Sequence, residues 1–264
     1  MPDALTILGG GGWFPAHGRQ TACALLRRGE HAVLIDAGTG VGRLVETPSL
    51  LDGIRRLDIV LTHFHLDHVA GLAYLPAALR ACEQKTVWGP GQLLYSTSTR
   101  ALLDAVSHEP FHPIPLEDQA IDVRDLPDQE IDFSGMRMAV RRQDRHSVPT
   151  LGLRFDDELA WITDTAYDAD SAAFARGCRV LAHEAWYTTA HPRHPEIHSS
   201  AAQAAHVAGQ AGIDRLLLMH LPPFELELCD LLAEARLEVP NAIAADDYRD
   251  LSALLTPNGA AAAI

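Results

Sequence analysis

The sequence is poor in cysteine and almost free of lysine, and both shortages exclude particular chemistries. Its four cysteines, Cys23, Cys82, Cys178 and Cys229, are scattered without a CxxC pair. This argues against a disulfide framework and against a thiolate zinc site. Only Lys85 among the 21 Lys and Arg residues is a lysine, so a Schiff-base mechanism would depend on that one side chain. A reducing compartment is the natural setting for such a chain.

Long apolar runs are also missing. No segment approaches the roughly 20 residues that a membrane-spanning helix needs. The residues before the first apolar stretch, Met1-Pro2-Asp3, carry none of the basic side chains that begin a secretory signal. We therefore expect a cytoplasmic protein that does not enter the membrane. With 264 residues of uniform composition, 47% of them hydrophobic, the chain is expected to form one α/β domain over residues 1–264.

Positive charge is scarce as well. The formal net charge is -14 at pH 7, so a nucleic acid would have to bind a local basic patch against the overall field of the protein. This balance favours a small-molecule substrate over a long polyanion.

The sequence does contain a dense group of metal-binding side chains, in the stretch THFHLDH at residues 62–68. His63 and His65 are two apart in an extended segment, so their side chains share a face and can reach one metal ion. Asp67 and His68 follow where the chain turns into a helix, and we expect them to face a second ion. Crowding four titratable groups without a cation is costly. The stretch therefore predicts a metal centre.

Apolar strands alternate with helical patterns along the chain, and polar residues recur where strands end. In open α/β sheets this carboxyl edge is where sites are built. The segment at residues 59–63 also resembles the segment at residues 216–220. This similarity between the two halves indicates a two-layer repeat with the site along the shared edge. The strand-ending polar residues are His63, Asp164, His183 and His220.

Local patterns predict helices over residues 50–56, 69–81, 92–106 and 201–211, the last with Ser199 or Ser200 as its N-cap. The glycine run at residues 9–12 lacks the lysine of a phosphate-binding loop, so we expect it to make a sharp turn close to a ligand. Residues 107–132 are rich in Pro and Asp and show only a weak strand signal near 121–123.

The HFHLDH motif, the later His146, the TDT piece around Asp164 and the strand-ending His220 together resemble the metallo-β-lactamase superfamily. Within it, the HEA piece at residues 183–185 and the HSS piece at 198–200 make the second half similar to ribonuclease Z and the small phosphodiesterases near it. The resemblance spans nearly the whole chain. It implies an α/β fold of four layers, an αββα sandwich, with a di-metal site on one edge.

The resemblance also implies a ligand set. The ligands are His63, His65 and His146 for one metal ion, Asp67, His68 and His220 for the other, and Asp164 as the bridge between them. Nitrogen and carboxylate ligands without sulfur suit Zn²⁺, with Mn²⁺ or Fe²⁺ as alternatives. Two such ions, about 3.5 to 4 Å apart, would lower the pKa of a bridging water and clamp a phosphoryl oxygen.

Delivery of a proton to the leaving group is the implied role of His198, with Glu184 orienting its ring and raising its basicity. We expect Asp67 to be a catalytic residue as well as a metal ligand. His198 could instead be a loop histidine that helps to cap the following helix, and Glu184 a purely structural carboxylate. His183 is expected only to anchor its strand end. Trp186 could form an apolar wall, although core packing is the stronger interpretation.

The chain departs from ribonuclease Z in one respect. Ribonuclease Z carries a long flexible arm that grips tRNA, inserted between its third motif histidine and its bridging aspartate. Here only 17 residues lie between His146 and Asp164, which is room for two strands and a turn. The missing arm and the acidic charge argue against tRNA. We predict a binuclear-metal hydrolase that cleaves a small or cyclic phosphodiester through a metal-bridging hydroxide.

Other functions remain open at this point. The same metal ions could serve hydrolysis of a lactone, a thioester, a sulfate ester or a β-lactam. An oxygen-reducing di-iron protein of this fold is a further alternative. Such proteins usually have Glu at the position of His65 and carry a flavin domain, and this chain has His65 and no room for that domain. A non-enzymatic binding protein is disfavoured because all seven expected ligands are present. Loops 13–20, 107–132 and 187–197 are expected to select the substrate, and relatives often dimerise, which leaves a homodimer open.

Overall fold

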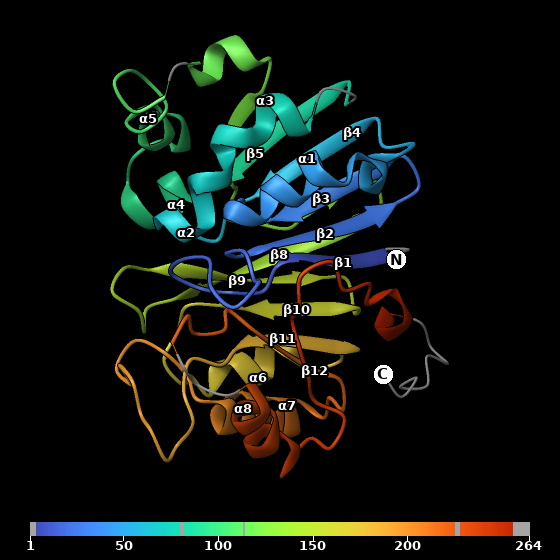
Figure 1. The fold of residues 1–264 in the computed structure, drawn as a ribbon, viewed down its shortest axis with the longest axis vertical. Helices are drawn as coiled ribbons and strands as arrows, with labels where there is room; N and C mark the ends of the chain where they lie inside the picture. Colours follow the sequence, from blue (N-terminus) through green and yellow to red (C-terminus); the bar gives the residue numbers. More distant parts are fainter. Residues whose placement is uncertain (1–3, 80–81, 113, 225–227, 256–264) are drawn as a thin grey trace.

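Two β-sheets face each other at the centre of the molecule, and helices cover their outer faces, giving four layers (Figure 1). The computed structural model describes residues 4–79, 82–112, 114–224 and 228–255. Its mixed α/β architecture is the αββα sandwich that the resemblance implied. None of the helices in these ranges is both long and apolar enough to cross a membrane.

The first sheet contains six strands in sequence order. The pairs β1–β2 and β2–β3 are antiparallel, and the remaining neighbours are parallel. The strands are β1 (Ala4–Gly9), β2 (Cys23–Arg28), β3 (His31–Ile35), β4 (Arg56–Val60), β5 (Gln84–Gly89) and β6 (Asp122–Asp125).

The second sheet contains seven strands in the order β13-β12-β11-β10-β9-β8-β7. Strands β10 to β13 are parallel, and β7 to β10 pair antiparallel. The strands are β7 (Ile131–Phe133), β8 (Met136–Gln143), β9 (Thr150–Phe155), β10 (Leu159–Ile162), β11 (Val180–Glu184), β12 (Leu216–Met219) and β13 (Ile243–Ala244).

Most helices are short, and they occupy the two outer layers (Figure 1). Beside the first sheet lie α1 (Gly42–Glu46), α2 (Leu66–Val69), α3 (Leu75–Ala78), α4 (Gly91–Tyr95) and α5 (Thr99–Asp104). Beside the second lie α6 (Asp170–Ala175), α7 (Ala201–Ala211) and α8 (Leu228–Arg236). The 3-10 turns are η1 (Thr39–Val41), η2 (Pro48–Leu51), η3 (Ala70–Tyr74), η4 (Leu116–Gln119) and η5 (Ser252–Leu255).

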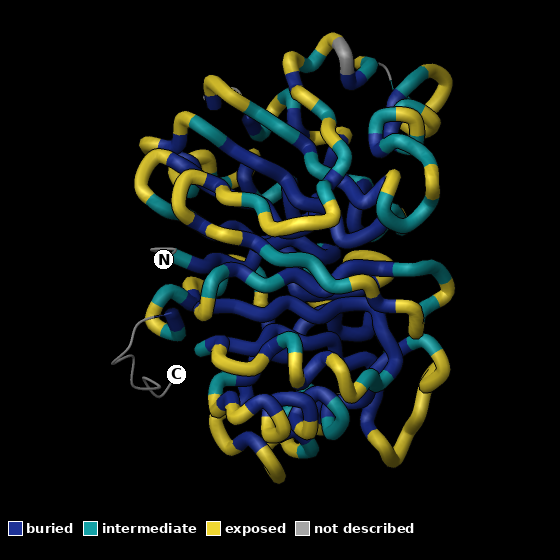
Figure 2. The backbone as a smooth tube through the Cα atoms, turned by 180° about the vertical axis from the view of Figure 1, so that it is seen from behind, coloured by how far each residue is buried: buried dark blue, intermediate teal, exposed yellow. Residues whose placement is uncertain are grey.

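Three apolar clusters hold the four layers together. One fills the space between the sheets and includes Phe133, Phe155 and Trp161, all buried. A second joins the first sheet to its helices, and a third joins the second sheet to α6, α7 and α8. Buried backbone is accordingly concentrated in the two central sheets (Figure 2). This packing holds the two sheets against each other, so that their strand ends meet at a shared edge.

Helix α7 shows why the sequence begins and ends a helix where it does. The Ser200 hydroxyl accepts from the backbone N–H of Gln203, and the Gln203 side chain accepts from the Ser200 N–H, which makes a capping box. Gly212 ends the helix in the left-handed region, at a φ of 72°. The helix over residues 201–211 is confirmed, with Ser200 as its N-cap.

The other expected helices are wrong in extent. Residues 50–56 do not form a helix, because η2 ends at Leu51, Gly53 takes a φ of 76° and β4 begins at Arg56. Residues 69–81 break into η3 and α3, since Pro76 begins a new helix where it lacks an N–H to continue the old one. Positions 80–81 of that expectation lie outside the described residues.

The helix expected over 92–106 is two helices. Ser96 takes a left-handed conformation at φ 53° and ends α4, and Ser98 caps α5 by accepting from the N–H of Ala101. Within residues 107–132, the weak strand signal corresponds to β6. Strand β7, which pairs with β8, was not anticipated.

The cluster between the sheets gives a stability prediction. Phe155 is fully buried there, so we expect Phe155→Ala to lower the free energy of unfolding by about 3–5 kcal/mol in urea titrations. Leu237→Ala removes a side chain that is 88% exposed and should change that free energy by less than about 0.5 kcal/mol. A Phe155→Ala loss no larger than the Leu237→Ala loss would contradict this description of the core.

Candidate metal centre

Side chains from both sheets meet at one edge of the molecule, each placed by the carboxyl end of a strand. The stretch from His63 to His68 follows β4, His146 follows β8, Asp164 follows β10 and His220 follows β12. Because β10 and β12 run parallel to β11 between them, their ends lie at the same edge.

The backbone is left-handed after three strands, β3, β10 and β12. Asp36, which follows β3, has a φ of 58°, and Asp164 and His220 each have a φ of 49°. Few residues other than glycine adopt this region, although Asp and His do so more readily than most. Such strain persists where surrounding structure enforces it, and it concentrates at functional sites. Here it turns the chain sharply, so that the side chains face the shared edge.

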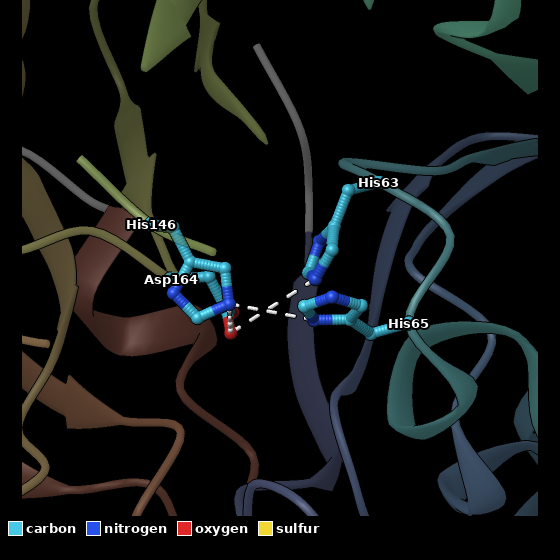
Figure 3. Close-up of side chains that lie close together, drawn as sticks. All are labelled: His63, His65, His146 and Asp164. Atoms are coloured by element: carbon cyan, nitrogen blue, oxygen red, sulfur yellow. Dashed lines mark hydrogen bonds and ion pairs between the residues drawn. The ribbon is translucent and has the colours of Figure 1, made fainter. Parts of the chain in front are cut away.

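A first group of four side chains converges on one point (Figure 3). The ligand atoms of His63, His65, His146 and Asp164 all lie within 4.8 Å of one another. Asp164 Oδ1 is 3.6 Å from His146 Nε2 and 4.0 Å from His63 Nε2. His146 Nε2 is also 3.4 Å from His65 Nδ1. Four ligand atoms this close together could hold one metal ion.

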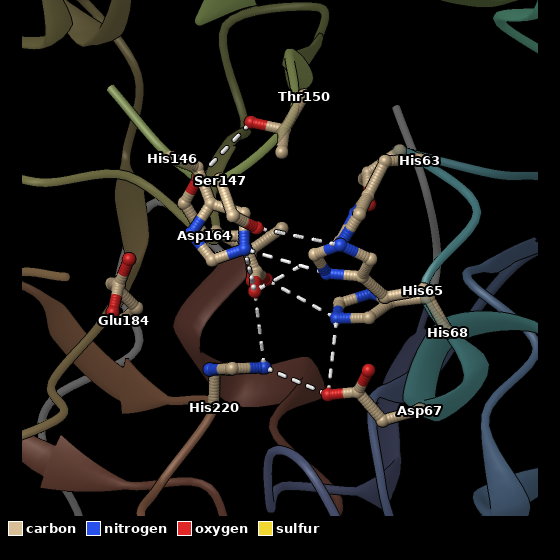
Figure 4. Close-up of polar contacts among 12 residues, drawn as sticks. His63, His65, Asp67, His68, His146, Ser147, Thr150, Asp164, Glu184 and His220 are labelled. Atoms are coloured by element: carbon tan, nitrogen blue, oxygen red, sulfur yellow. Dashed lines mark hydrogen bonds and ion pairs between the residues drawn. The ribbon is translucent and has the colours of Figure 1, made fainter. Parts of the chain in front are cut away.

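A second group lies beside the first (Figure 4). Asp67 Oδ2 is 3.2 Å from His220 Nε2 and 3.6 Å from His68 Nε2, and the three residues again fall within the 4.8 Å limit. Asp164 faces this group too, with Oδ2 at 3.1 Å from His68 Nε2 and Oδ1 at 3.4 Å from His220 Nε2. The structure thus brings together all seven residues that the resemblance implied, with Asp164 between the two groups.

Two buried ring nitrogens test whether these residues fit a metal ion. Among the described residues, His63 Nε2 has no hydrogen-bond partner, and His68 Nε2 faces only carboxylate oxygens, Asp164 Oδ2 at 3.1 Å and Asp67 Oδ2 at 3.6 Å. The opposite nitrogens are engaged, His63 Nδ1 with Thr62 Oγ1 at 3.1 Å and His68 Nδ1 with Asp36 Oδ2 at 2.9 Å. An unpaired buried nitrogen is costly, whereas a histidine held through one nitrogen commonly binds a metal ion through the other. The donor set fits divalent metal ions.

The pKa values of the histidines shift in opposite directions in the two groups. Burial lowers the pKa of His63 well below its ordinary value, and it also lowers the pKa of His65. Both rings are therefore held in the neutral form that binds metals. Burial also opposes charge on His68, but the carboxylates of Asp164, Asp36 and Asp67 outweigh it and raise its pKa well above the usual range. This concentration of negative charge is what a cation would neutralise.

Asp36 contacts the candidate ligand His68 and was missed by sequence reasoning. Its fully buried carboxylate accepts from the Thr62 N–H at 2.7 Å, from the Thr62 hydroxyl at 3.0 Å and from His68 Nδ1 at 2.9 Å. These bonds fix the His68 ring with Nε2 toward the centre. The available signal was an acidic residue directly after the buried strand 32–35, next to the strand that delivers the histidines.

The glycine run passes close to the same centre, as expected. A Cβ on Gly12 would come within 2.4 Å of the His220 ring, so only glycine permits this approach. The Gly12 N–H donates to the Leu221 carbonyl at 3.0 Å, and the Trp13 N–H donates to Asp67 Oδ2 at 2.7 Å. The loop after β1 therefore positions two of the candidate ligands.

His198 lies at the border of the centre with a carboxylate behind it. Its Nδ1 donates to Glu184 Oε2 at 2.8 Å, and the second Glu184 oxygen accepts from the Thr165 N–H. The Trp186 ring stacks on His198 at 4.6 Å between centroids and on His220 at 5.3 Å. His198 also has a nitrogen within 4.8 Å of ligand atoms of Asp164 and His220. Trp186 is thus part of the site wall as well as buried.

Two other histidines are not members of these groups, His183 at the end of β11 and His17 in the loop at residues 13–20. His183 is buried and contacts the Glu184 carbonyl through Nδ1 at 2.9 Å. Because neighbouring residues of a strand point to opposite faces, it does not share the position of Glu184. The His17 ring contacts the carbonyl of Pro223, in the loop after β12, at 3.1 Å.

Known proteins resemble this chain in both sequence and structure. A family model described as a beta-lactamase superfamily domain matches residues 31–221. A ribonuclease Z from Mycobacterium sp. (strain KMS) is 30% identical over 243 residues, which cover 83% of this chain and 84% of the relative. The metallo-beta-lactamase fold protein YhfI from Bacillus subtilis has a TM-score of 0.77 at 20% identity, over 95% of this chain and 99% of its own. A diphosphatase from the PhnP family has a TM-score of 0.71 at 20% identity, over 94% of this chain and 96% of its own.

The position of Asp36 behind His68 gives a metal-binding prediction. Asp36→Asn keeps the shape and tolerates the left-handed backbone but removes the charge, so we expect affinity for Zn²⁺ to fall about 10- to 100-fold. Competition with a chromophoric chelator measures this. Asp52→Asn changes an exposed carboxylate elsewhere and should leave the affinity unchanged. Equal affinities for the parent and Asp36→Asn would contradict the role assigned to Asp36.

Proposed function

Because the chain belongs to the metallo-β-lactamase superfamily, in its ribonuclease Z-like branch, we propose that it hydrolyses a small or cyclic phosphodiester with the help of two divalent metal ions. Membership makes it a hydrolase of this superfamily. The finer proposal rests on one observation. His198, backed by the buried carboxylate of Glu184, borders two groups of metal-binding side chains.

The proposed ligands follow the two groups of side chains. His63, His65 and His146 would hold one ion, Asp67, His68 and His220 would hold the other, and Asp164 would contribute to both. Zn²⁺ is the first choice for these nitrogen and oxygen donors, with Mn²⁺ and Fe²⁺ as alternatives. When bound, such a pair of ions supplies an acidic water and a clamp for charged phosphoryl oxygens.

The protein itself supplies the proton for the leaving group. A departing alkoxide is a poor leaving group unless it is protonated, and His198 offers Nε2 for that transfer while Nδ1 remains bonded to Glu184. Glu184 stabilises the charged imidazolium and fixes its orientation, and it is itself held by the Thr165 N–H. Stacking against Trp186 restricts the ring further.

The expected substrate is small. The interval between His146 and Asp164 consists mainly of β9, β10 and the turn that joins them, so it offers no arm for a long nucleic acid. The net charge of -14 opposes polyanions as well. The relative named ribonuclease Z and the structural neighbour described as a diphosphatase both act on phosphoryl groups by their names. The proposal treats residues 1–264 as one domain, which the shared cluster between the sheets supports.

The role of His198 predicts a dependence on the leaving group. His198→Ala should lower kcat about 10²- to 10⁴-fold for adenosine 2′,3′-cyclic monophosphate, whose leaving alkoxide needs a proton. It should have little effect on bis(4-nitrophenyl) phosphate, whose phenolate leaves without one. Glu184→Gln keeps a side-chain acceptor for the ring and should give a smaller loss on the cyclic substrate.

Metal content measured on the same variants shows whether His198 is a proton donor or a metal ligand. His198→Ala should bind as much Zn²⁺ as the parent, because the residue donates a proton and is not a ligand. Loss of metal, or an equal loss of rate on both substrates, would contradict the assignment. If the metal-loaded parent cleaves neither phosphodiester, the proposed bond is wrong, and a panel of lactone, thioester, sulfate ester and β-lactam substrates then tests the alternatives.

A further inference from the structure

A continuous row of aromatic rings leads from the candidate metal centre to solvent. The His220 ring stacks on Trp186, with centroids 5.3 Å apart, and Trp186 lies 6.0 Å from Phe224. Phe224 is 5.6 Å from Trp13, which is 5.2 Å from Phe14. The row begins at a candidate ligand and ends on the surface, so it offers one molecule contacts at both the centre and the surface.

The outer rings are exposed, unlike the inner ones. Trp186 is 3% exposed, whereas Trp13 is 61% and Phe14 45% exposed. Trp13 meets both Phe14 and Phe224 edge to face, at interplanar angles of 64° and 67°, so these neighbours leave ring surface open for another planar group. Two adjacent exposed rings beside a candidate active centre are more than the scattered apolar residues of an ordinary surface.

The loop that carries these rings is fixed in place. The Trp13 N–H donates to Asp67 Oδ2 at 2.7 Å, and the Phe14 N–H donates to the Gly12 carbonyl at 2.9 Å. Trp13 has a φ of 63°, a strained conformation for a bulky residue, which is retained only where the surroundings enforce it. The exposed rings are therefore presented in a fixed geometry to whatever occupies the centre.

A third segment reaches the same place. Arg193, in the loop between β11 and α7, lies over the Phe224 ring at 4.8 Å. The loop after β1, coloured blue, and the loop after β11, coloured orange, extend toward the same end of the sheets (Figure 1). Chain segments that follow β1, β11 and β12 thus meet around these rings.

We propose that Trp13, Phe14 and Phe224, together the aromatic rim, stack the nucleobase of a nucleotide whose phosphodiester occupies the metal centre. This rests on the proposed function and narrows its substrate class to nucleotides. Every base has a π-face, and stacking on aromatic side chains gives affinity with little demand on base identity. An aliphatic ester group could cover the rings but would not gain the offset-stacked contact that an aromatic base makes with an exposed ring.

Two substrates with the same leaving group test the proposal. Thymidine 5′-(4-nitrophenyl) phosphate and methyl 4-nitrophenyl phosphate carry the same charge and differ in the nucleoside. With Zn²⁺-loaded protein, Trp13→Ala should raise KM for the thymidine ester about tenfold, within the range that loss of one base stack causes. The KM of the thymidine ester should rise about tenfold relative to that of the methyl ester in the same variant, a ratio that cancels any effect of the substitution on the metal centre itself. Truncating the side chain leaves the backbone N–H that binds Asp67 in place.

Conservative and control variants sharpen the test. Trp13→Phe should retain most of the affinity for the thymidine ester because it keeps a ring, and Phe14→Ala provides a second truncation of the rim. Leu237→Ala removes an exposed apolar side chain at the end of α8 and should leave both substrates unaffected. Equal effects of Trp13→Ala and Phe14→Ala on the two esters, or none on either, would overturn the proposal.

A binding measurement separates failure of the rim from failure of the reaction. Calorimetry with Zn²⁺-loaded protein should show about tenfold weaker binding of thymidine 5′-monophosphate to Trp13→Ala than to the parent, with inorganic phosphate bound equally by both. If the parent hydrolyses neither ester, the phosphodiesterase proposal fails, while this comparison still decides the rim. Equal binding of thymidine 5′-monophosphate by parent and variant would overturn the role of Trp13.

Discussion

The mutual electrostatics of imidazoles and carboxylates in one buried space is the constraint on which this structure depends. Asp164 faces His63, His68, His146 and His220 at distances between 3.1 and 4.0 Å. Burial alone would disfavour a charge on Asp164, but His220, His68 and His63 hold the pKa of this carboxyl well below its usual range. Such a set of groups is stable only with compensating positive charge, which protons or metal ions can provide.

Much of the surrounding architecture can be understood as support for that arrangement. The ends of β3, β10 and β12 carry residues with positive φ, and the glycine run after β1 comes close enough to contact the His220 ring. Asp36 fixes His68 from behind, and Glu184 fixes His198 at the opposite border. The two sheets contribute to the centre from both sides, so the cluster between them also determines the distance between its two halves.

The resemblance to a known superfamily supplied the fold and the full set of candidate ligands, whereas local signals supplied the first histidine pair and the start of one helix. In HFHLDH the spacing itself places two histidines on one face, and the capping box of α7 is contained in four consecutive residues. Asp36 and Trp13 left no comparable signal. Their roles depend on contacts with residues 32 and 54 positions away. The helices expected over 69–81 and 92–106 were interrupted where Pro76 and Ser96 changed the backbone, which an apolar pattern does not register.

The number of metal ions per chain tests the central claim most directly. Protein saturated with Zn²⁺ and freed of excess metal should contain two ions per chain by elemental mass spectrometry. Removing one ligand from each group, in His65→Ala and in His220→Ala, should leave about one ion in each variant, because each substitution weakens one position of the pair. A parent that retains far fewer than two ions, or variants that retain as many as the parent, would contradict the assignment of these residues to a two-metal centre.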